Sequence, residues 1–264
     1  MEPSASQIEE WDRTQEQLRQ QLCLTDSIDF TPTYASDGDK SGSIEGFDNL
    51  RYIAGMDISY PRNRDDVAVA AYVILEYPSL KANTIECLMT VPYKAGYLAF
   101  KELPHFLTLH KRLIQKRPEL VPQVLFVDGN GVLHPRKFGS ACHIGVSLNI
   151  PTIGVAKNFL QLTHNSSDEI LLTMNGVKSK FKECLVDGQN VLHIKDKSGF
   201  IYGAALAPTP EITSPIFVSV GHRVSLDVAL ALTSICCKFR VPEPIRHADI
   251  ISRIESRKIE DQSK

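Results

Sequence analysis

Residues 51–60 read RYIAGMDISY, and they begin the part of the chain whose pattern decides the fold. A short polar turn separates this run from VAVAAYVILEY at 67–77, and Pro78 and Ser79 separate the second run from KANTIECLMTV at 81–91. Apolar runs of this length, rich in β-branched and aromatic residues and joined by short polar connections, predict three strands in an antiparallel meander.

The segments after the meander alternate between helical and strand patterns. We predict a helix over 95–117, interrupted at Pro104, then the buried strand QVLFVDG at 123–129, a helix over 138–149 and the buried strand TIGVA at 152–156. Apolar strands separated by a helix indicate parallel pairing in a sheet that is buried on both faces. This order of elements predicts a ribonuclease H-like α/β fold, in which a mixed sheet of three antiparallel strands followed by parallel strands is flanked by helices.

The remaining segments define the expected domain organisation. Residues 5–22 predict an amphipathic helix within an N-terminal unit at 1–24, and the polar stretch 25–48 predicts a flexible loop. A single domain is expected over 49–252, with a C-terminal tail at 253–264. Within that domain, we predict further strands over 168–206 and 216–220 and a helix over 225–239.

Composition limits the class of protein. The 264 residues are 43% hydrophobic and 23% charged, with a net charge of −2. Proteins that bind nucleic acid through charge alone are normally basic, so any such contact would rely on local basic patches and on a metal. No apolar run reaches the roughly 20 residues of a membrane span, and the N-terminus lacks the pattern of a secretory signal. We expect a soluble cytoplasmic protein, with the nucleus or nucleolus as a further location and with buried or half-buried thiols.

Three carboxylates lie at positions that the predicted topology brings together. Asp57 lies in the middle of an apolar strand, where Asp is disfavoured, and Asp128 ends a buried strand, where ligands of α/β sheets gather. Glu102 lies on the helix that would pack across the sheet centre. Taken singly, the first Asp would fit a β-bulge at Gly55, the second a turn, and the Glu a solvated helix face. Three close carboxylates repel one another unless a cation binds, so together they predict a Mg²⁺ site, with Mn²⁺ as an alternative ion.

Five short motifs occur in order over about residues 50–250. They are Gly55-Met56-Asp57-Ile58-Ser59, Pro92-Tyr93 with Gly96-Tyr97-Leu98-Ala99-Phe100-Lys101-Glu102, Val127-Asp128-Gly129-Asn130-Gly131, Gly154-Val155-Ala156-Lys157 and Ser219-Val220-Gly221-His222-Arg223. This set resembles the endonuclease V family, and the closing segment from Pro242 to Asp249 looks like its animal members. The resemblance implies an enzyme that recognises inosine and cuts the second phosphodiester on its 3′ side, leaving a 5′-phosphate and a 3′-hydroxyl.

The resemblance leaves more than one substrate open. Animal members prefer inosine in RNA, so the main expectation is a monomeric endoribonuclease for inosine-containing single-stranded RNA. Bacterial members act on deaminated DNA, which makes repair of deoxyinosine the alternative. A non-cleaving inosine-RNA binding protein and a phosphatase with Asp128 as its nucleophile are alternatives from other classes.

Residue roles follow from the matching motifs. The resemblance places Asp57, Glu102 and Asp128 on the metal-binding carboxylates, and Pro92-Tyr93 on the wedge that fills the space left by the unstacked base. Lys157 would hold the scissile phosphate unless it merely opens a helix, and His222 would lie near the metal or the attacking water. The predicted nucleic-acid contacts are Pro92, Tyr93, Gly96, Lys101, Gly129, Asn130, Gly131, His134, Arg136, Lys137, Gly154 and Lys157.

Overall fold

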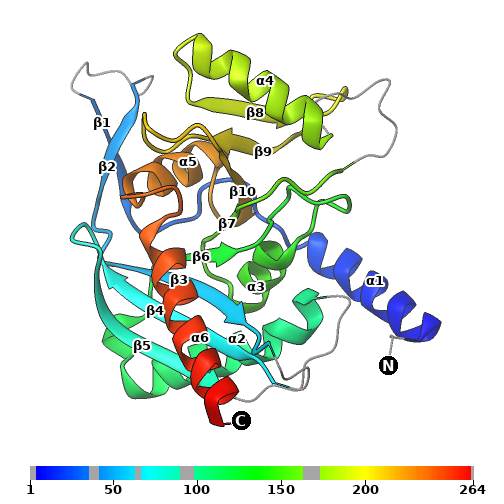
Figure 1. Cartoon of the computed structure of the whole chain (residues 1–264), viewed down its shortest axis with the longest axis vertical. Helices are drawn as coiled ribbons and strands as arrows, with labels where there is room; N and C mark the ends of the chain where they lie inside the picture. Colours follow the sequence, from blue (N-terminus) through cyan, green and yellow to red (C-terminus); the bar gives the residue numbers. More distant parts are fainter. Residues whose placement is uncertain (1–3, 36–41, 63–66, 90–97, 163–172, 263–264) are drawn as a thin grey trace.

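The computed structural model describes residues 4–35, 42–62, 67–89, 98–162 and 173–262, in which an eight-stranded sheet carries helices on both faces (Figure 1). The strands are β1 (Thr31–Tyr34), β2 (Ile44–Asp48), β3 (Tyr52–Ser59), β4 (Val69–Glu76), β5 (Lys81–Met89), β6 (Val124–Asp128), β7 (Thr152–Ala156), β8 (Val191–Lys195), β9 (Ile201–Leu206) and β10 (Ile216–His222). The helices are α1 (Ala5–Arg19), α2 (Leu98–Lys116), a 3-10 turn (Pro118–Leu120), α3 (Ser140–Leu148), α4 (Met174–Val186), α5 (Leu226–Ile235) and α6 (Glu243–Gln262).

The large sheet has the strand order β5-β4-β3-β6-β7-β10-β9-β8. Its first three strands pair antiparallel, as the meander predicts. β6 pairs parallel with β3 on one side and with β7 on the other, which confirms the predicted parallel centre. β10, β9 and β8 then extend the sheet in antiparallel fashion.

Helices cover the two faces of the sheet and thereby decide where each side chain of β3 points. α6 crosses β3 and β4 on one face, and α2 and α3 lie on the other (Figure 1). Met56 packs with Phe106 of α2, whereas Gly55 meets the backbone of Pro244 in α6 so closely that no Cβ would fit. Since side chains alternate along a strand, Asp57 lies on the same face as Gly55 and points toward α6.

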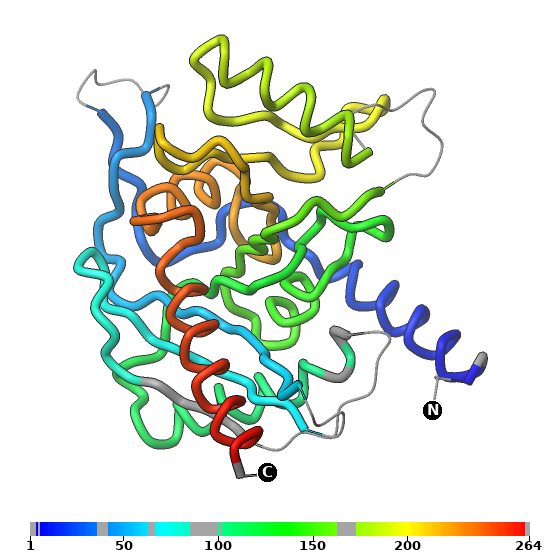
Figure 2. The backbone as a smooth tube through the Cα atoms, viewed as in Figure 1, coloured from blue at the N-terminus to red at the C-terminus, as the bar shows by residue number. Residues whose placement is uncertain are grey.

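The predicted flexible loop at 25–48 is wrong in part, because it contains the two-stranded sheet of β1 and β2. Phe30 and Phe47 anchor this sheet with an edge-to-face ring contact, and both rings are buried. The chain before it is also docked. Figure 2 shows its course from α1 toward β1, and the Ser27 N–H donates a hydrogen bond of 3.0 Å to the Arg223 carbonyl oxygen. Two buried aromatic residues therefore hold the described parts of a stretch whose composition is otherwise that of a loop.

Three other predictions differ from the structure. α6 continues to residue 262, so most of the expected tail at 253–264 is helical. α4 occupies part of 168–206, where we predict strands, because Val177, Phe181 and Cys184 recur at helical spacing and are buried. Pro104 does not interrupt α2.

Two further features concern the described ranges as a whole. None of their helices combines the length and the apolar character needed to cross a membrane. The cysteines at 23, 142, 184, 236 and 237 are free thiols that are buried or partly buried, as predicted.

Candidate active site

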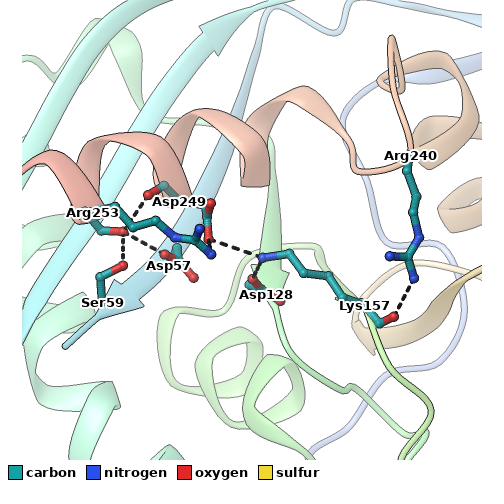
Figure 3. Close-up of polar contacts among 8 residues, drawn as sticks. Asp57, Ser59, Asp128, Lys157, Arg240, Asp249 and Arg253 are labelled. Carbon is teal, nitrogen blue, oxygen red and sulfur yellow. Dashed lines mark hydrogen bonds and ion pairs between the residues drawn. The ribbon is translucent and has the colours of Figure 1, made fainter. Parts of the chain in front are cut away.

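Three carboxylates from three different elements meet near the carboxyl ends of the central strands β3 and β6 (Figure 3). Asp57 lies in β3, Asp128 ends β6 and Asp249 lies in α6, and one oxygen of each lies within 4.8 Å of the others. β3 and β6 are parallel neighbours with Met56 opposite Val127, so the residue that follows in each strand reaches the same place. The predicted convergence of Asp57 with Asp128 is therefore present.

Asp249 is the member of this cluster that sequence reasoning missed. α6 crosses the face toward which Asp57 points, and its serine side chains take part in the contact. Ser252 Oγ donates a hydrogen bond of 2.7 Å to Asp57 Oδ2, and the Ser59 hydroxyl lies 2.7 Å from Ser252 Oγ (Figure 3). α6 thus supplies both a third carboxylate and the hydroxyl that orients the first.

Burial and charge repulsion act on Asp57 together. Its side chain is buried, and burial raises the pKa of the Asp57 carboxyl to about 7. The Ser252 hydrogen bond opposes this rise, while the negative charges of Asp128 and Asp249 add to it. The cluster is therefore short of positive charge at neutral pH.

Lys157 supplies part of the missing charge. Its Nζ lies 2.6 Å from Asp128 Oδ2 and 3.3 Å from Asp249 Oδ1, directly after β7 (Figure 3). Partial burial would lower the pKa of Lys157, but the carboxylates around it raise that pKa above its ordinary value. Arg240 donates a hydrogen bond of 2.7 Å to the Lys157 carbonyl oxygen and so fixes the backbone that presents the ammonium group.

Glu102 approaches the cluster from α2 but does not belong to the group of three. Its Oε1 accepts a hydrogen bond of 3.0 Å from the Tyr60 hydroxyl. Burial raises the pKa of the Glu102 carboxyl to about 7, the Tyr60 bond opposes the rise, and the charges of Asp57 and Asp128 add to it. Glu102 is therefore within electrostatic reach of the cluster, and its predicted role as a metal ligand stays a prediction.

The donor set suits a hard divalent cation. Carboxylate oxygens with room for water and phosphate are what Mg²⁺ binds, and Asp57, Asp128 and Asp249 would hold it here. A cation at this point would relieve the repulsion that raises the pKa of Asp57. The group contains no Cys or His, the ligands typical of zinc sites.

A cavity of about 400 Å³ opens on one side of the carboxylates. Its wall includes Phe100, Phe138, Asn130 and His134, together with Asp57 and Asp128 themselves. Aromatic and amide groups around a space of this size suit a planar polar ring such as a nucleobase.

A groove of about 760 Å³ opens on the other side of the same carboxylates. It shares Asp57 and Asp128 with the cavity. It adds basic and acidic side chains, which are Lys157, Arg62, Arg253, Arg257, Asp249, Glu260 and Asp261. Arg253 lies 2.9 Å from Asp249 on the next turn of α6. The carboxylates therefore lie between an aromatic cavity and a groove lined by side chains of both charges.

The structure brings several predicted nucleic-acid residues to the cavity and leaves others away from it. Gly129, Asn130, His134 and Arg136 all line it. Burial, with the nearby Arg136 charge, lowers the pKa of His134 to about 4, so its ring is neutral at pH 7. Lys137 does not line the cavity, because its Nζ lies 3.7 Å from the centre of the Phe200 ring.

Packing within the protein explains why residues 131 and 154 are glycines. The prediction was instead that a substrate approaches the backbone of Gly131 and Gly154. A Cβ on Gly131 would collide with the carbonyl of Val220, and a Cβ on Gly154 would collide with the backbone of Gly131. These glycines let the loop after β6 pack tightly against β7 and β10. The structure places neither of them on the wall of the cavity or of the groove.

His222 is not brought to the carboxylates. It pairs with Thr152 at the start of β7, which is the opposite end from Lys157. Its Nδ1 accepts a hydrogen bond of 3.3 Å from the Cys23 N–H, and its side chain is buried. This placement corrects the prediction of a catalytic His222, since the residue holds the N-terminal segment against the sheet.

For the remaining predicted residues, the structure gives at most the element on which they lie. Pro92, Tyr93 and Gly96 lie outside the described residues. Lys101 lies on α2.

Comparisons with known proteins show which chains are similar to this one. A family model described as Endonuclease V matches residues 39–250. Endonuclease V of Mus musculus is 44% identical over 210 residues, covering 78% of this chain and 60% of the mouse protein. Endonuclease V of Homo sapiens is 42% identical over 215 residues, covering 80% of this chain and 74% of the human protein.

Solved structures extend the likeness to three dimensions. Ciona intestinalis Endonuclease V, in complex with a 23mer DNA containing an inosine followed by a ribo-adenosine, has a TM-score of 0.83 and 35% identity, covering 97% of this chain and 100% of that one. The catalytic domain of human Endonuclease V has a TM-score of 0.79 and 37% identity, covering 97% and 98%.

The sheet topology is that of a protein with a ribonuclease H-like fold, and its carboxylates form a site that could hold a metal ion. With the family model matching most of its length, the chain belongs to the endonuclease V family.

Proposed function

We propose that this protein is a Mg²⁺-dependent endonuclease that cuts inosine-containing single-stranded RNA at the second phosphodiester 3′ to the inosine. The products carry a 5′-phosphate and a 3′-hydroxyl. The observation that carries the proposal is the position of the three carboxylates between the cavity and the groove, because Asp57 and Asp128 line both. A base held in the cavity leaves the following nucleotides in the groove, with a phosphate at the carboxylates.

The residues around this phosphate have distinct roles in the proposed reaction. A bound Mg²⁺ would supply a Lewis acid and lower the pKa of a water molecule. Lys157 holds the phosphate by charge, from its position between Asp128 and Asp249. With its pKa raised to about 7, the Glu102 carboxyl is suited to accept a proton at Oε1 or Oε2 near neutral pH.

The preference for RNA draws support from the Ciona complexes. Two of these structures contain DNA in which the inosine is followed by a ribo-adenosine. A ribose at that position carries the 2′-hydroxyl by which a protein distinguishes RNA from DNA. Cleavage of deoxyinosine in DNA is the second candidate, because the rest of those strands is DNA.

A matched substrate panel tests the choice. We expect faster cleavage of a single-stranded RNA with one inosine than of the same sequence as DNA, and loss of both reactions in a chelator. A DNA strand with a single ribonucleotide 3′ to the inosine should be cut nearly as fast as the RNA. Initial cleavage rates measure the preference, and the chemical groups at the product ends identify the bond that is cut. Faster cutting of the all-DNA substrate would overturn the RNA preference.

The groove makes a separate prediction about charge. Arg257→Gln should weaken RNA binding and reduce the slope of log Kd against log salt concentration by about 0.7, the value for one lost phosphate contact on a single strand. Lys258→Gln is the matched control, because Lys258 has the same charge one residue along α6 but pairs with Glu255. Equal slopes for the two variants would contradict a strand path along this groove.

A further inference from the structure

Lys157 lies one residue beyond β7, where the pairing of β7 with β10 has already ended. The last pair of that ladder joins Ala156 to Phe217, and the same register would place Pro215 opposite residue 158. Proline has no N–H, so it cannot donate a further bond that would extend the ladder. The backbone of Lys157 therefore needs another contact if its ammonium group is to stay at the carboxylates.

Arg240 makes this contact from the segment between α5 and α6 (Figure 3). Its Nη2 donates a hydrogen bond of 2.7 Å to the Lys157 carbonyl oxygen and one of 2.9 Å to the Pro215 carbonyl oxygen. Its Nε donates a third bond, of 3.0 Å, to the Ser214 carbonyl oxygen. One planar guanidinium thus joins the end of β7 to the start of β10, with donors in a fixed arrangement that a lysine does not have.

The segment that carries Arg240 leads directly into α6, whose first turn is held by charge. Glu243 is buried there and accepts hydrogen bonds of 2.7 and 2.6 Å from the Arg246 guanidinium. The same helix presents Asp249, whose Oδ1 lies 3.3 Å from Lys157 Nζ. The chain between Arg240 and Asp249 therefore holds Lys157 at both ends, by its carbonyl oxygen and by its ammonium group.

We infer that Arg240 is a positioning residue that sets where the Lys157 ammonium group meets the scissile phosphate, an inference that rests on the proposed function. The hydrogen bonds of 2.7, 2.9 and 3.0 Å from its guanidinium all end on backbone carbonyl oxygens, so Arg240 acts through Lys157 and not on the RNA. A shift of about 1 Å in a group that contacts the reacting atoms can lower a rate about a hundredfold.

A double-mutant cycle tests this dependence on Lys157. Single-turnover cleavage of an inosine-containing RNA is measured for Arg240→Met, for Lys157→Met and for the double variant. We expect Arg240→Met to lower the cleavage rate about tenfold or more in the original protein, and to change it by less than about threefold when Lys157→Met is already present. Such non-additivity is the signature of two residues that act as one unit.

Arg223 provides the matched control. Its guanidinium also donates to backbone carbonyl oxygens, those of Ser27 at 3.1 Å and Asn149 at 2.8 Å, but it lies beside the start of β7 and not beside Lys157. Arg223→Met should therefore lower the melting temperature, as Arg240→Met does, and leave the cleavage rate within about threefold. Arg240→Lys keeps the charge but not the planar donors, so its rate should stay close to that of Arg240→Met.

Other outcomes would overturn the inference. The same fold-loss from Arg240→Met with and without Lys157 would mean that Arg240 acts independently, for example by contacting the RNA itself. Full activity of Arg240→Lys would show that its charge suffices, and an equal loss of rate in Arg223→Met would reduce its role to stability. If Arg240→Met does not fold, Arg240→Gln replaces it with the same criteria. Failure of the unmutated protein to cut inosine RNA would instead refute the proposed function.

Discussion

Replacing Asp57 with asparagine is expected to lower kcat/KM for an inosine-containing RNA by about a thousandfold or more. The amide keeps the shape of the side chain and can still accept the Ser252 hydrogen bond, but it carries no charge. A bound metal contributes several kcal/mol to stabilising the transition state of phosphodiester cleavage, and about 4 kcal/mol corresponds to a thousandfold. Single-turnover cleavage with saturating Mg²⁺ measures the loss.

Two further variants show whether the loss of cleavage comes from the carboxylate cluster. Asp249→Asn should cause a comparable loss, because its oxygen lies in the same group as those of Asp57 and Asp128. Glu45→Gln, at an exposed position of β2, should leave cleavage unchanged. If Asp57→Asn retained cleavage within about threefold of the original protein, the carboxylate cluster would not be the metal site.

Ionisation of Asp57 is expected to lower the free energy of unfolding of the metal-free protein as the pH rises from about 4 to about 7. Its pKa is about 7 in the folded chain against an ordinary value of 3.8, so in this window the folded state binds more protons than the unfolded state. Stability from this group is fully present below the lower value and is lost as the pH passes the higher one. The change in the free energy of unfolding is on the order of 4 kcal/mol.

Unfolding in a chelator, followed from pH 5 to pH 8, measures this effect. Asp57→Asn should be more stable than the original protein at pH 8 and should show a flatter pH dependence, whereas Glu45→Gln should follow the original curve. Mg²⁺ should raise the melting temperature of the original protein strongly at pH 8 and little at pH 5, because it competes with protons for the same oxygens. Parallel curves for Asp57→Asn and the original protein would show that Asp57 does not titrate in this range.

The central sheet was predictable because its signals are local. β3, β4 and β5 each read as an apolar run between turns, and β6 and β7 as short buried strands, so the meeting of Asp57 with Asp128 followed from parallel pairing alone. α6 was not recognised because the face that it packs on the sheet includes Ser252 and Ser256, both buried, and these interrupt its apolar stripe.

The rest of the site depends on contacts between distant parts of the chain. Asp249 is a single Asp on a helix, and only the crossing of α6 over β3 brings it to Asp57. His222 lies in a motif of the family, yet the direction of β10 takes it to the far end of β7. Lys178, Lys180 and Lys182 alternate as on a strand, but the buried Val177 and Phe181 make that segment a helix.

The position of Asp249 in the final helix also has a consequence during synthesis. A growing chain can fold β3 and β6 early, since domains form from the N-terminal side as they are made. Its third carboxylate is added only with α6, which is made after β3 and β6. Under the proposed function, a growing chain that does not yet include α6 lacks part of its metal site and cannot cut RNA.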